Sequence, residues 1–312
     1  MRYSHYFLVL FVVLPSILVA TELVPMPLKV IYDDAKAQLG KKLFADPILS
    51  KNKKISCLSC HDLSSNGADT VAYSIGIHGR KARFNTPTIY NATYNFRQFW
   101  DGRSRNLKEQ ALDPIENPNE MGNSIKQVLL DLKANAEYVK RFKHLYDEGI
   151  SKDSLSDALS EFGKALTTPN SDFDYYLQGD KSAISTQAIE GYRLFQERGC
   201  ISCHNGINIG GNLYNKFGIY EESQSKELGR YEITQKVEDK FVFKVPSLRN
   251  VSLTAPYMHD GSVTSLEDAV NMMSKYQLGR PMKDEELHAI VAFLQTLVGE
   301  RPSIVKDMNA SH

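Results

Sequence analysis

Two short segments of the chain repeat one arrangement of residues that can form thioether bonds and ligate a metal. Each has two cysteines separated by two residues and followed directly by a histidine, and the chain has no other cysteine. This spacing lets two thiols add to the vinyl groups of one haem while the histidine ligates its iron. The sequence therefore predicts two covalently attached c-type haems. Their residues are Cys57, Cys60 and His61 in the first segment and Cys200, Cys203 and His204 in the second.

Other chemistry is open to four cysteines, but each alternative leaves part of the pattern unexplained. Two Cys-x-x-Cys pairs can hold zinc, yet the histidine after each pair would then have no role, and the pairs lie far apart in the sequence. A redox-active pair favours a strand-to-helix turn in a βαβ unit, which the pattern does not predict. Structural disulfides would make the identical spacing and both histidines a coincidence. Haem attachment is the interpretation that uses every residue.

Length and charge set the broad class. A chain of 312 residues is typical of two domains, which would give one haem to each. Lysine plus arginine and aspartate plus glutamate both total 37, so the formal net charge is zero. No overall field favours a nucleic acid or an anionic membrane, and we expect no nucleic-acid partner.

Residues 1–20 have the pattern of a secretory signal peptide. One positive charge at Arg2 precedes an apolar run over residues 6–20 that is too short for a comfortable transmembrane helix. Leu18 makes the site for a cut after Ala20 imperfect, so an uncleaved anchor is the alternative. Either outcome places the mature chain in the periplasm, where covalent haem attachment is expected.

Hydrophobic periodicity is helical through most of the remaining chain. Only residues 241–245 alternate, which predicts one short strand and no sheet. Thr264 and Glu267 form a capping box at the start of one helix. The fold class is therefore predicted as all-α, with helices over residues 33–44, 125–146, 153–167, 186–198, 266–276 and 283–298.

The chain divides into two units with the same order of parts: a helix, a haem segment, a long irregular stretch and further helices. We predict an N-terminal haem domain over residues 21–175 and a C-terminal haem domain over residues 176–312. Residues 171–184 read as a linker with a short turn. The stretches 64–87 and 205–230 are too long for plain connections, so we expect them to wrap the haem edges.

Several further segments, in the same order along the chain, resemble segments of the bacterial di-haem cytochrome c peroxidases, a family related to the MauG enzymes. This resemblance implies two cytochrome c-like domains. The N-terminal haem would be the peroxidatic centre, and the C-terminal haem would take electrons from a small donor protein, a cytochrome c or a cupredoxin. Relatives dimerise, which leaves a homodimer open for this chain. The segments are Leu39–Phe44, Asn85–Thr88, Gln98–Arg103, Glu109–Ala111, Asn117–Met121, Pro246–Asn250 and Thr254–Gly261.

The resemblance also implies which residues serve the peroxidatic haem. Glu120 matches the family's glutamate and Gln110 its glutamine. A carboxyl group whose pKa is raised by desolvation can move a proton between the two peroxide oxygens. Without the family, Glu120 could be a surface or helix-capping carboxylate. Trp100 matches a residue between the two haems, although a single tryptophan is more often a core anchor.

In the resting form of relatives, a loop histidine ligates the other face of the peroxidatic haem. His78 is the nearest candidate here, but counting from Asn85 and Trp100 places Ile77 at the family position. Either His78 ligates the iron, or this haem is five-coordinate and needs no opening. A solvent-exposed loop histidine is the plain alternative.

The C-terminal haem needs a second axial ligand besides His204. Met273 lies four residues before Gln277-Leu-Gly, which is where the family places its methionine. A thioether ligand raises the reduction potential, whereas a tyrosinate lowers it. Met273 could also be ordinary core packing, and Met272 and Met258 are the alternative ligands.

The family binds a calcium ion between its domains through one asparagine side chain and two backbone carbonyls. The matching residues are Asn85, Thr254 and Pro256. Oxygen ligands of this kind suit a water-rich calcium site. Asn85 could equally form a turn before Pro87.

The expected function is reduction of hydrogen peroxide to water with electrons from a small periplasmic donor. A MauG-like enzyme that oxidises a protein substrate and a non-catalytic di-haem electron carrier are the alternatives. MauG enzymes have tyrosine where this chain has Met273, which speaks against the first. A carrier has no use for a pocket acid, so Glu120 with Gln110 speaks against the second.

Overall fold

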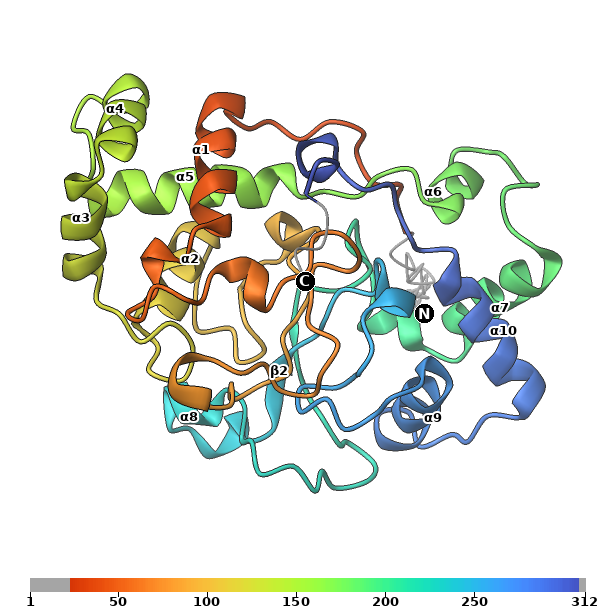
Figure 1. Cartoon of the computed structure of the whole chain (residues 1–312). Helices are drawn as coiled ribbons and strands as arrows, with labels where there is room; N and C mark the ends of the chain where they lie inside the picture. Colours follow the sequence, from red (N-terminus) through yellow and green to blue (C-terminus); the bar gives the residue numbers. More distant parts are fainter. Residues whose placement is uncertain (1–22, 309–312) are drawn as a thin grey trace, which may run out of the picture.

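The computed structural model describes residues 23–308, so the predicted signal peptide lies outside the described residues. The described chain is mainly helical, which agrees with the predicted fold class (Figure 1). Its α-helices are α1 (Asp34–Ala45), α2 (Leu107–Glu116), α3 (Ile125–Ala134), α4 (Ala136–Leu145), α5 (Lys152–Ala165), α6 (Asp172–Leu177), α7 (Thr186–Glu197), α8 (Tyr231–Thr234), α9 (Leu266–Tyr276) and α10 (Asp284–Gln295).

Two short strands correct the prediction that the fold has no sheet. The expected strand is present as β2 (Val242–Lys244), and it pairs antiparallel with β1 (Tyr214–Lys216). Asn215 lies opposite Phe243 in this register. The partner strand lies within the long irregular stretch, where periodicity gives no signal for three residues.

Each half of the molecule is built on one close pair of helices. In the first half α1 packs on α5, and a Cβ on Gly40 would lie only 2.0 Å from the carbonyl oxygen of Ala158. In the second half α7 packs on α10, and a Cβ on Gly191 would lie 1.8 Å from the carbonyl oxygen of Ala289. Only glycine permits either approach, because any side chain would overlap the facing backbone.

The helix pairs carry separate hydrophobic cores. Leu39, Leu43 and Leu155 are fully buried in the first core, which also takes in α3 and α4. Phe195 and Phe293 contact each other in the second, with ring centroids 5.2 Å apart. Burial of large side chains of this kind contributes roughly 1.5–3 kcal/mol each, so each pair forms a rigid support for the haem segment that follows its first helix.

The two ends of the described chain cross between the halves. Leu23 packs into the core of α7 and α10, whereas Ile304 and Val305 pack against Phe162 and Leu166 at the end of α5. The predicted boundary between domains stays a prediction, but the ends of the chain tie the two halves together.

Local capping explains where helix predictions differ from the structure. The helix predicted over residues 125–146 is two helices, because the side chain of Asn135 accepts hydrogen bonds from the backbone of Glu137 and Tyr138 and starts α4. α9 is capped by Ser265, not Thr264. α2 was not predicted, since Pro114 lies inside it and interrupts a helical reading.

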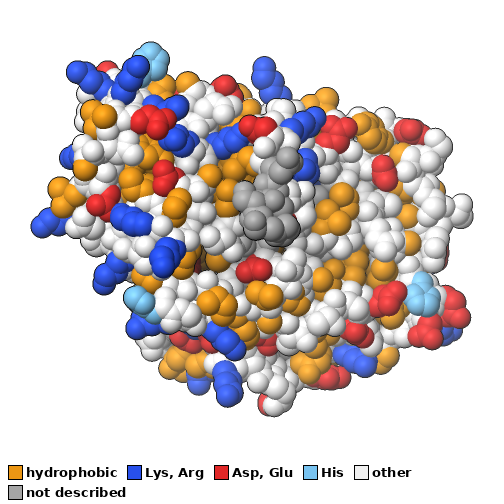
Figure 2. Space-filling model, viewed as in Figure 1, with side chains coloured by type: hydrophobic (Ala, Val, Ile, Leu, Met, Phe, Trp, Pro, Cys, Tyr) orange, Lys and Arg blue, Asp and Glu red, His pale blue; other side chains and the backbone are white. Residues whose placement is uncertain are grey.

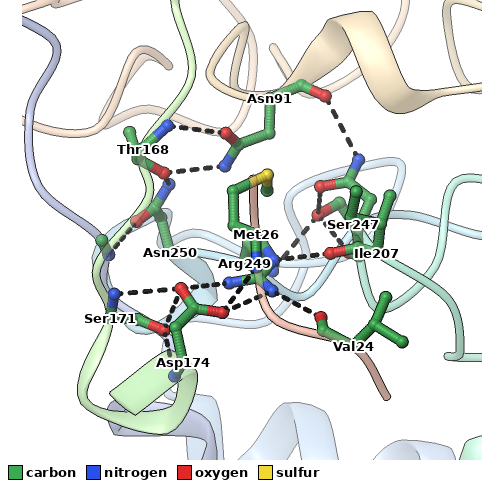
Figure 3. A network of polar contacts seen from close by, with 12 residues as sticks. Val24, Met26, Asn91, Thr168, Ser171, Asp174, Ile207, Ser247, Arg249 and Asn250 are labelled. Atoms are coloured by element: carbon green, nitrogen blue, oxygen red, sulfur yellow. Dashed lines mark hydrogen bonds and ion pairs between the residues drawn. The ribbon is translucent and has the colours of Figure 1, made fainter. Parts of the chain in front are cut away.

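A buried ion pair holds the loop after β2 in place (Figure 3). Arg249 is only 1% exposed and donates to both carboxylate oxygens of Asp174, at 3.0 and 2.9 Å. Asp174 also accepts from the backbone of Met26 at 2.9 Å, and Arg249 donates to the carbonyls of Ile207 and Val24. The pair therefore joins residues 24–26, α6 and the loop that follows the second haem segment.

Charged side chains are spread unevenly over the surface despite the zero net charge. On the face shown in Figure 2, basic side chains are most frequent on the side where α3 and α4 lie. α4 alone carries Lys140, Arg141 and Lys143. Among residues 23–308, no helix is long and apolar enough to cross a membrane.

Candidate haem sites

The first haem segment begins with the short 3₁₀ turn Cys57–Ser59. The backbone N–H of His61 donates to the carbonyl of Cys57 at 3.0 Å, so the histidine lies directly under the turn. Its Nδ1 donates to the carbonyl of Gly67 at 3.0 Å, which leaves Nε2 for a metal. Desolvation lowers the pKa of His61, so the imidazole is in the neutral form that ligates iron.

These residues line a cavity of about 420 Å³, here called the first cavity. Desolvation raises the pKa of Cys57 to about 12 and that of Cys60 to about 11, so both thiols are neutral at pH 7. Within the described part of the chain no group of three or more histidine, cysteine, aspartate or glutamate residues is placed to hold a metal ion. The arrangement fits thioether attachment better than a zinc site.

The structure brings Gln110 and Glu120 to the first cavity, together with His61. Gln110 lies on α2, and Glu120 lies in the turn that follows this helix. The turn is closed by the backbone N–H of Glu120, which donates to the carbonyl of Asn117 at 3.0 Å. The Asn117 side chain in turn donates to the Glu120 carboxylate at 2.6 Å. The side chain of Glu120 is therefore held in one orientation.

The pKa of Glu120 is raised above its ordinary value, mainly by burial. The nearby Asp113 carboxylate raises it further, whereas Arg103 and the hydrogen bond from Asn117 lower it. A carboxyl group with a raised pKa is a better proton acceptor and donor near neutral pH than an ordinary glutamate. This is the property that proton transfer to and from peroxide needs.

Arg103 is the cation that lowers the pKa of Glu120. It donates to both Asp113 oxygens, at 3.1 and 2.9 Å, and to Asp101 at 3.1 and 3.2 Å. Its guanidinium also lies over the ring of Phe99, 3.5 Å from the centroid. The guanidinium is thus held by two carboxylates and a ring, and its position relative to Glu120 is well defined.

The second haem segment repeats the 3₁₀ turn, over Cys200–Ser202, after Gly199 in the left-handed conformation at φ 93°. The backbone N–H of His204 again donates to the carbonyl of Cys200, at 3.0 Å. Burial lowers the pKa of His204 to about 4, although the carbonyls of Pro246 and Ile209 lie near enough to oppose the shift. Nδ1 of His204 is buried and makes no hydrogen bond within the described chain. The imidazole is neutral and able to ligate iron.

A second cavity, of about 250 Å³, is lined by Cys200, Cys203 and His204. Desolvation raises the pKa of Cys200 to about 11. As in the first cavity, two thiols and one neutral imidazole face a space on one wall. Both sites fit the covalently held haems that the motifs predict.

Methionine side chains face the second cavity. Met273 on α9 lines it, as does Met258 in the loop before that helix. Met272 is not among the lining residues and packs instead in the small cluster around Tyr257. Met282, which the sequence did not single out, also lines the cavity. Thioether ligands are therefore available, with Met273 placed on a rigid helix.

One wall is shared by the two cavities. Trp100 and Lys244 line both, together with Asn85 and Pro246. Trp100 is fixed in this wall, because its Nε1 donates to the carbonyl of Asn85 at 2.9 Å and its own carbonyl accepts from the backbone of Lys244 at 2.8 Å. The indole therefore lies in the wall that the two cavities share, and its role in electron transfer stays a prediction.

His78 does not face the first cavity. It lies exposed in a short turn at φ 58°, and neither His78 nor Ile77 lines the space above His61. Ile77 is buried, and its backbone N–H donates to the carbonyl of Glu120 at 2.7 Å. In this conformation the loop holds the Glu120 turn and offers no histidine ligand.

The three residues expected to bind calcium come together at the second cavity. Asn85, Thr254 and Pro256 all line it. The amide nitrogen of Asn85 donates to the carbonyls of Val71 and Ala72, each at 3.2 Å, so its orientation is set by neighbouring backbone. The calcium site itself stays a prediction.

Comparison with known proteins agrees with this geometry. Residues 34–182 match a family model described as di-haem cytochrome c peroxidase, and residues 188–298 match one described as cytochrome c. The chain is 44% identical over 269 residues to the cytochrome c551 peroxidase of Nitrosomonas europaea, covering 85% of this chain and 80% of the relative. The chain belongs to the di-haem cytochrome c peroxidase family. Its two haem segments are accordingly assigned to two c-type haems.

Further relatives of the family span both of its branches. The cytochrome c551 peroxidase of Pseudomonas aeruginosa is 40% identical, covering 87% of this chain and 81% of the relative. The methylamine utilization protein MauG of Methylorubrum extorquens is 32% identical, covering 91% and 84%. A solved MauG-like protein associated with microbial copper homeostasis superposes with a TM-score of 0.80 at 27% identity, covering 94% of this chain and 97% of that one.

Several residues of the sites were missed from the sequence. Arg103 lay in a segment quoted for its resemblance, but no pattern showed that it would pair with Asp113 on α2. Lys244 lay in the predicted strand, where alternation gave no sign that a lysine would point inward. Met282 follows α9 in a loop, outside any helical pattern. Only the fold brings these side chains to the cavities.

Proposed function

We propose that this protein is a cytochrome c peroxidase that reduces hydrogen peroxide to water with electrons from a small donor protein, a cytochrome c or a cupredoxin. The observation that carries the proposal is the meeting of Glu120 and Gln110 with His61 in one cavity. A cavity that serves electron transfer alone has no need of a carboxyl group with a raised pKa.

The chemistry needs two electrons and two protons for each peroxide. A haem held by Cys57, Cys60 and His61 would supply an iron with an open position and a path for electrons. Glu120 accepts the proton of the bound peroxide oxygen and returns it to the oxygen that leaves as water. Gln110 holds the peroxide by a hydrogen bond without competing for the proton, because an amide is neutral at any relevant pH.

The second cavity would hold the electron that the first cavity consumes. Met273 would supply a thioether ligand to a haem held there by Cys200, Cys203 and His204, and such a ligand raises the reduction potential. Trp100, in the wall between the cavities, is proposed to shorten the gap that the electron crosses. These roles rest on the placement of the three side chains around the two cavities.

His78 is exposed and does not line the first cavity, so the loop 74–80 would offer no ligand to a haem held by His61. Peroxide would then bind without prior reduction of the second haem and without release of a loop ligand. The oxidised protein is expected to show a high-spin first haem and full activity in the first turnover. A lag that disappears after reduction, together with a low-spin spectrum lost in the variant His78→Ala, would contradict this.

Three further features belong to the proposal. Calcium is proposed at Asn85, Thr254 and Pro256, and its removal by a chelator should change the spectrum or the potential of a haem.

The periplasm is the proposed location, since haem attachment of this type accompanies export. Sedimentation of the purified protein with and without calcium tests whether it forms a homodimer.

One experiment tests the main proposal. The purified holoprotein is titrated electrochemically while haem absorption is followed, and peroxide-dependent oxidation of a reduced cytochrome c is then measured. We expect two haems per chain, one of them at high potential with a methionine ligand, and rapid donor oxidation. Two haems with no peroxide-dependent donor oxidation would instead favour an electron carrier, and oxidation of tryptophan in a protein substrate would favour a MauG-like enzyme.

A further inference from the structure

A lysine is buried in the wall between the two cavities. Lys244 is the last residue of β2, opposite Tyr214 in β1, and is only 7% exposed. It lines both cavities, and its backbone N–H donates to the carbonyl of Trp100 at 2.8 Å. The residue is therefore rigidly placed at the point where the two haem sites meet.

The ammonium group of Lys244 has no anionic partner among the described residues. No ion pair or side-chain hydrogen bond joins it to residues 23–308, and burial alone lowers its pKa to about 8. Asp101, a carboxylate of the first cavity, is already paired with Arg103. Taking an ammonium out of water without a counter-charge costs several kcal/mol. A negative group from outside the polypeptide would remove this cost.

The chemistry of the two cavities indicates which negative group this is. Each cavity is built for a haem, and every haem of this type carries two propionate carboxylates on one edge. Lysine and carboxylate form the charge-assisted pair that a buried site favours. We propose that Lys244 binds a haem propionate in the shared wall and that its charge raises the reduction potential of that haem.

The effect on the potential follows from electrostatics. Reduction adds one negative charge to a haem, and a nearby fixed cation stabilises the reduced form more than the oxidised form. The interaction is strong because the wall is desolvated. Lys244 is therefore a positioning and tuning residue rather than a catalytic one, since it acts through the cofactor edge. The inference rests only on the two haems and not on peroxidase activity.

The test measures midpoint potentials of both haems in the holoprotein, without peroxide. Lys244→Met removes the charge at similar length, and Lys244→Arg keeps it. Lys216→Met is the matched control, because Lys216 lies in the partner strand β1 and is exposed. We expect Lys244→Met to shift the reduction equilibrium of one haem at least tenfold toward the oxidised form, about 59 mV for one electron. Lys244→Arg and Lys216→Met should stay close to the unaltered protein.

A second measurement identifies the anion. The infrared bands of the propionate carboxylates should move in Lys244→Met and stay in Lys216→Met, and the two haems can be told apart by their absorption. A potential shift in Lys244→Met no larger than in Lys216→Met would overturn the proposal. So would a shift that depends on the buffer anion, because a free ion would then be the partner.

A folding defect also gives an answer. If Lys244→Met loses haem, Lys244→Gln provides a second neutral variant with a polar end. Haem loss in both neutral variants with retention in Lys244→Arg would support a charge that holds the cofactor. Loss in Lys244→Arg as well would contradict it, because a retained charge would then not suffice.

Discussion

The two haem cavities are attached to the chain in the same way and yet differ in what surrounds them. The first is lined by Gln110, Glu120 and the Arg103–Asp113 pair, whereas the second is lined mainly by apolar side chains and methionines and by no carboxylate. Proton transfer needs titratable groups next to the open face of an iron. Storage of an electron needs none, and apolar surroundings with a thioether ligand favour the reduced iron. The difference in lining thus corresponds to a difference in task.

The largest effect is expected from removing the acid of the first cavity. Glu120→Gln keeps the size of the side chain but cannot accept a proton, so turnover should fall by roughly two to four decades. Both haems should stay attached with unchanged potentials. Glu148→Gln, at an exposed position, is the control. Peroxidase activity at the unaltered level in Glu120→Gln would show that Glu120 does not transfer the proton, and the two cavities would then not differ in this task.

The second cavity is tested through its proposed methionine ligand. Met273→His should lower the midpoint potential of the second haem by a substantial part of the roughly 0.8 V that axial ligands span. The first haem should not change. Met272→His, one residue away and outside the cavity lining, is the control. An unchanged potential in Met273→His would indicate that Met258 or Met282 is the thioether ligand instead.

The ion pair below the second cavity offers a test of stability. Arg249→Leu leaves Asp174 buried and unpaired and should lower the free energy of unfolding by about 3–5 kcal/mol. Leu248 and Val251 flank this arginine and line the second cavity, so the spectrum of the second haem should change while that of the first does not. Denaturant unfolding of the holoprotein measures the loss.

The exposed Arg193, paired with Glu190 and Glu197, provides the matched control for this loss. Arg193→Leu should cost less than about 1 kcal/mol. Equal losses in the two arginine variants would show that the buried pair does not hold the second site. A double variant with Asp174→Leu should recover part of the stability, because no buried charge is then left unpaired.

The smallest effect is expected in the pH dependence of the first cavity. Glu120 must be deprotonated to accept a proton, so kcat/KM should fall as the pH drops through its raised pKa, above the ordinary value of 4.5. Asp113→Asn removes a charge that raises this pKa, so the acid limb should move to lower pH, by less than about one unit at a partly exposed site. Asp147→Asn, which is exposed, should leave the limb in place. Movement of the limb to higher pH would contradict the assignment.

Much of the helical framework could be predicted, since α1, α5, α7, α9 and α10 were expected within a few residues of their bounds. The break at Asn135 was missed, because a capping asparagine competes with continued periodicity and its side-chain hydrogen bonds decide the outcome. Gly40 and Gly191 gave no signal either. Their role depends on a facing backbone that comes from a distant part of the sequence.

The candidate site was only partly readable from the residues themselves. Glu120, Gln110 and Trp100 were found through the family resemblance; all three line the first cavity, and their roles stay predictions. The exposed position of His78 and the buried loop residue Ile77 could not be decided by counting along the loop. A loop one residue out of register with its relatives turns a different side chain inward, and only packing selects which.

The sequence alone determined that this protein carries two covalent haems, because thioether attachment and proximal ligation need residues within one turn of chain. Local geometry is sufficient for that chemistry. The tertiary structure alone decided that the two sites share a wall and that Lys244 is buried without a counter-charge. It also decided that Arg103 lies near enough to Glu120 to lower the pKa of that carboxyl group. Those properties arise from contacts between segments far apart in the chain, and burial, which sets their energies, exists only once the segments have packed.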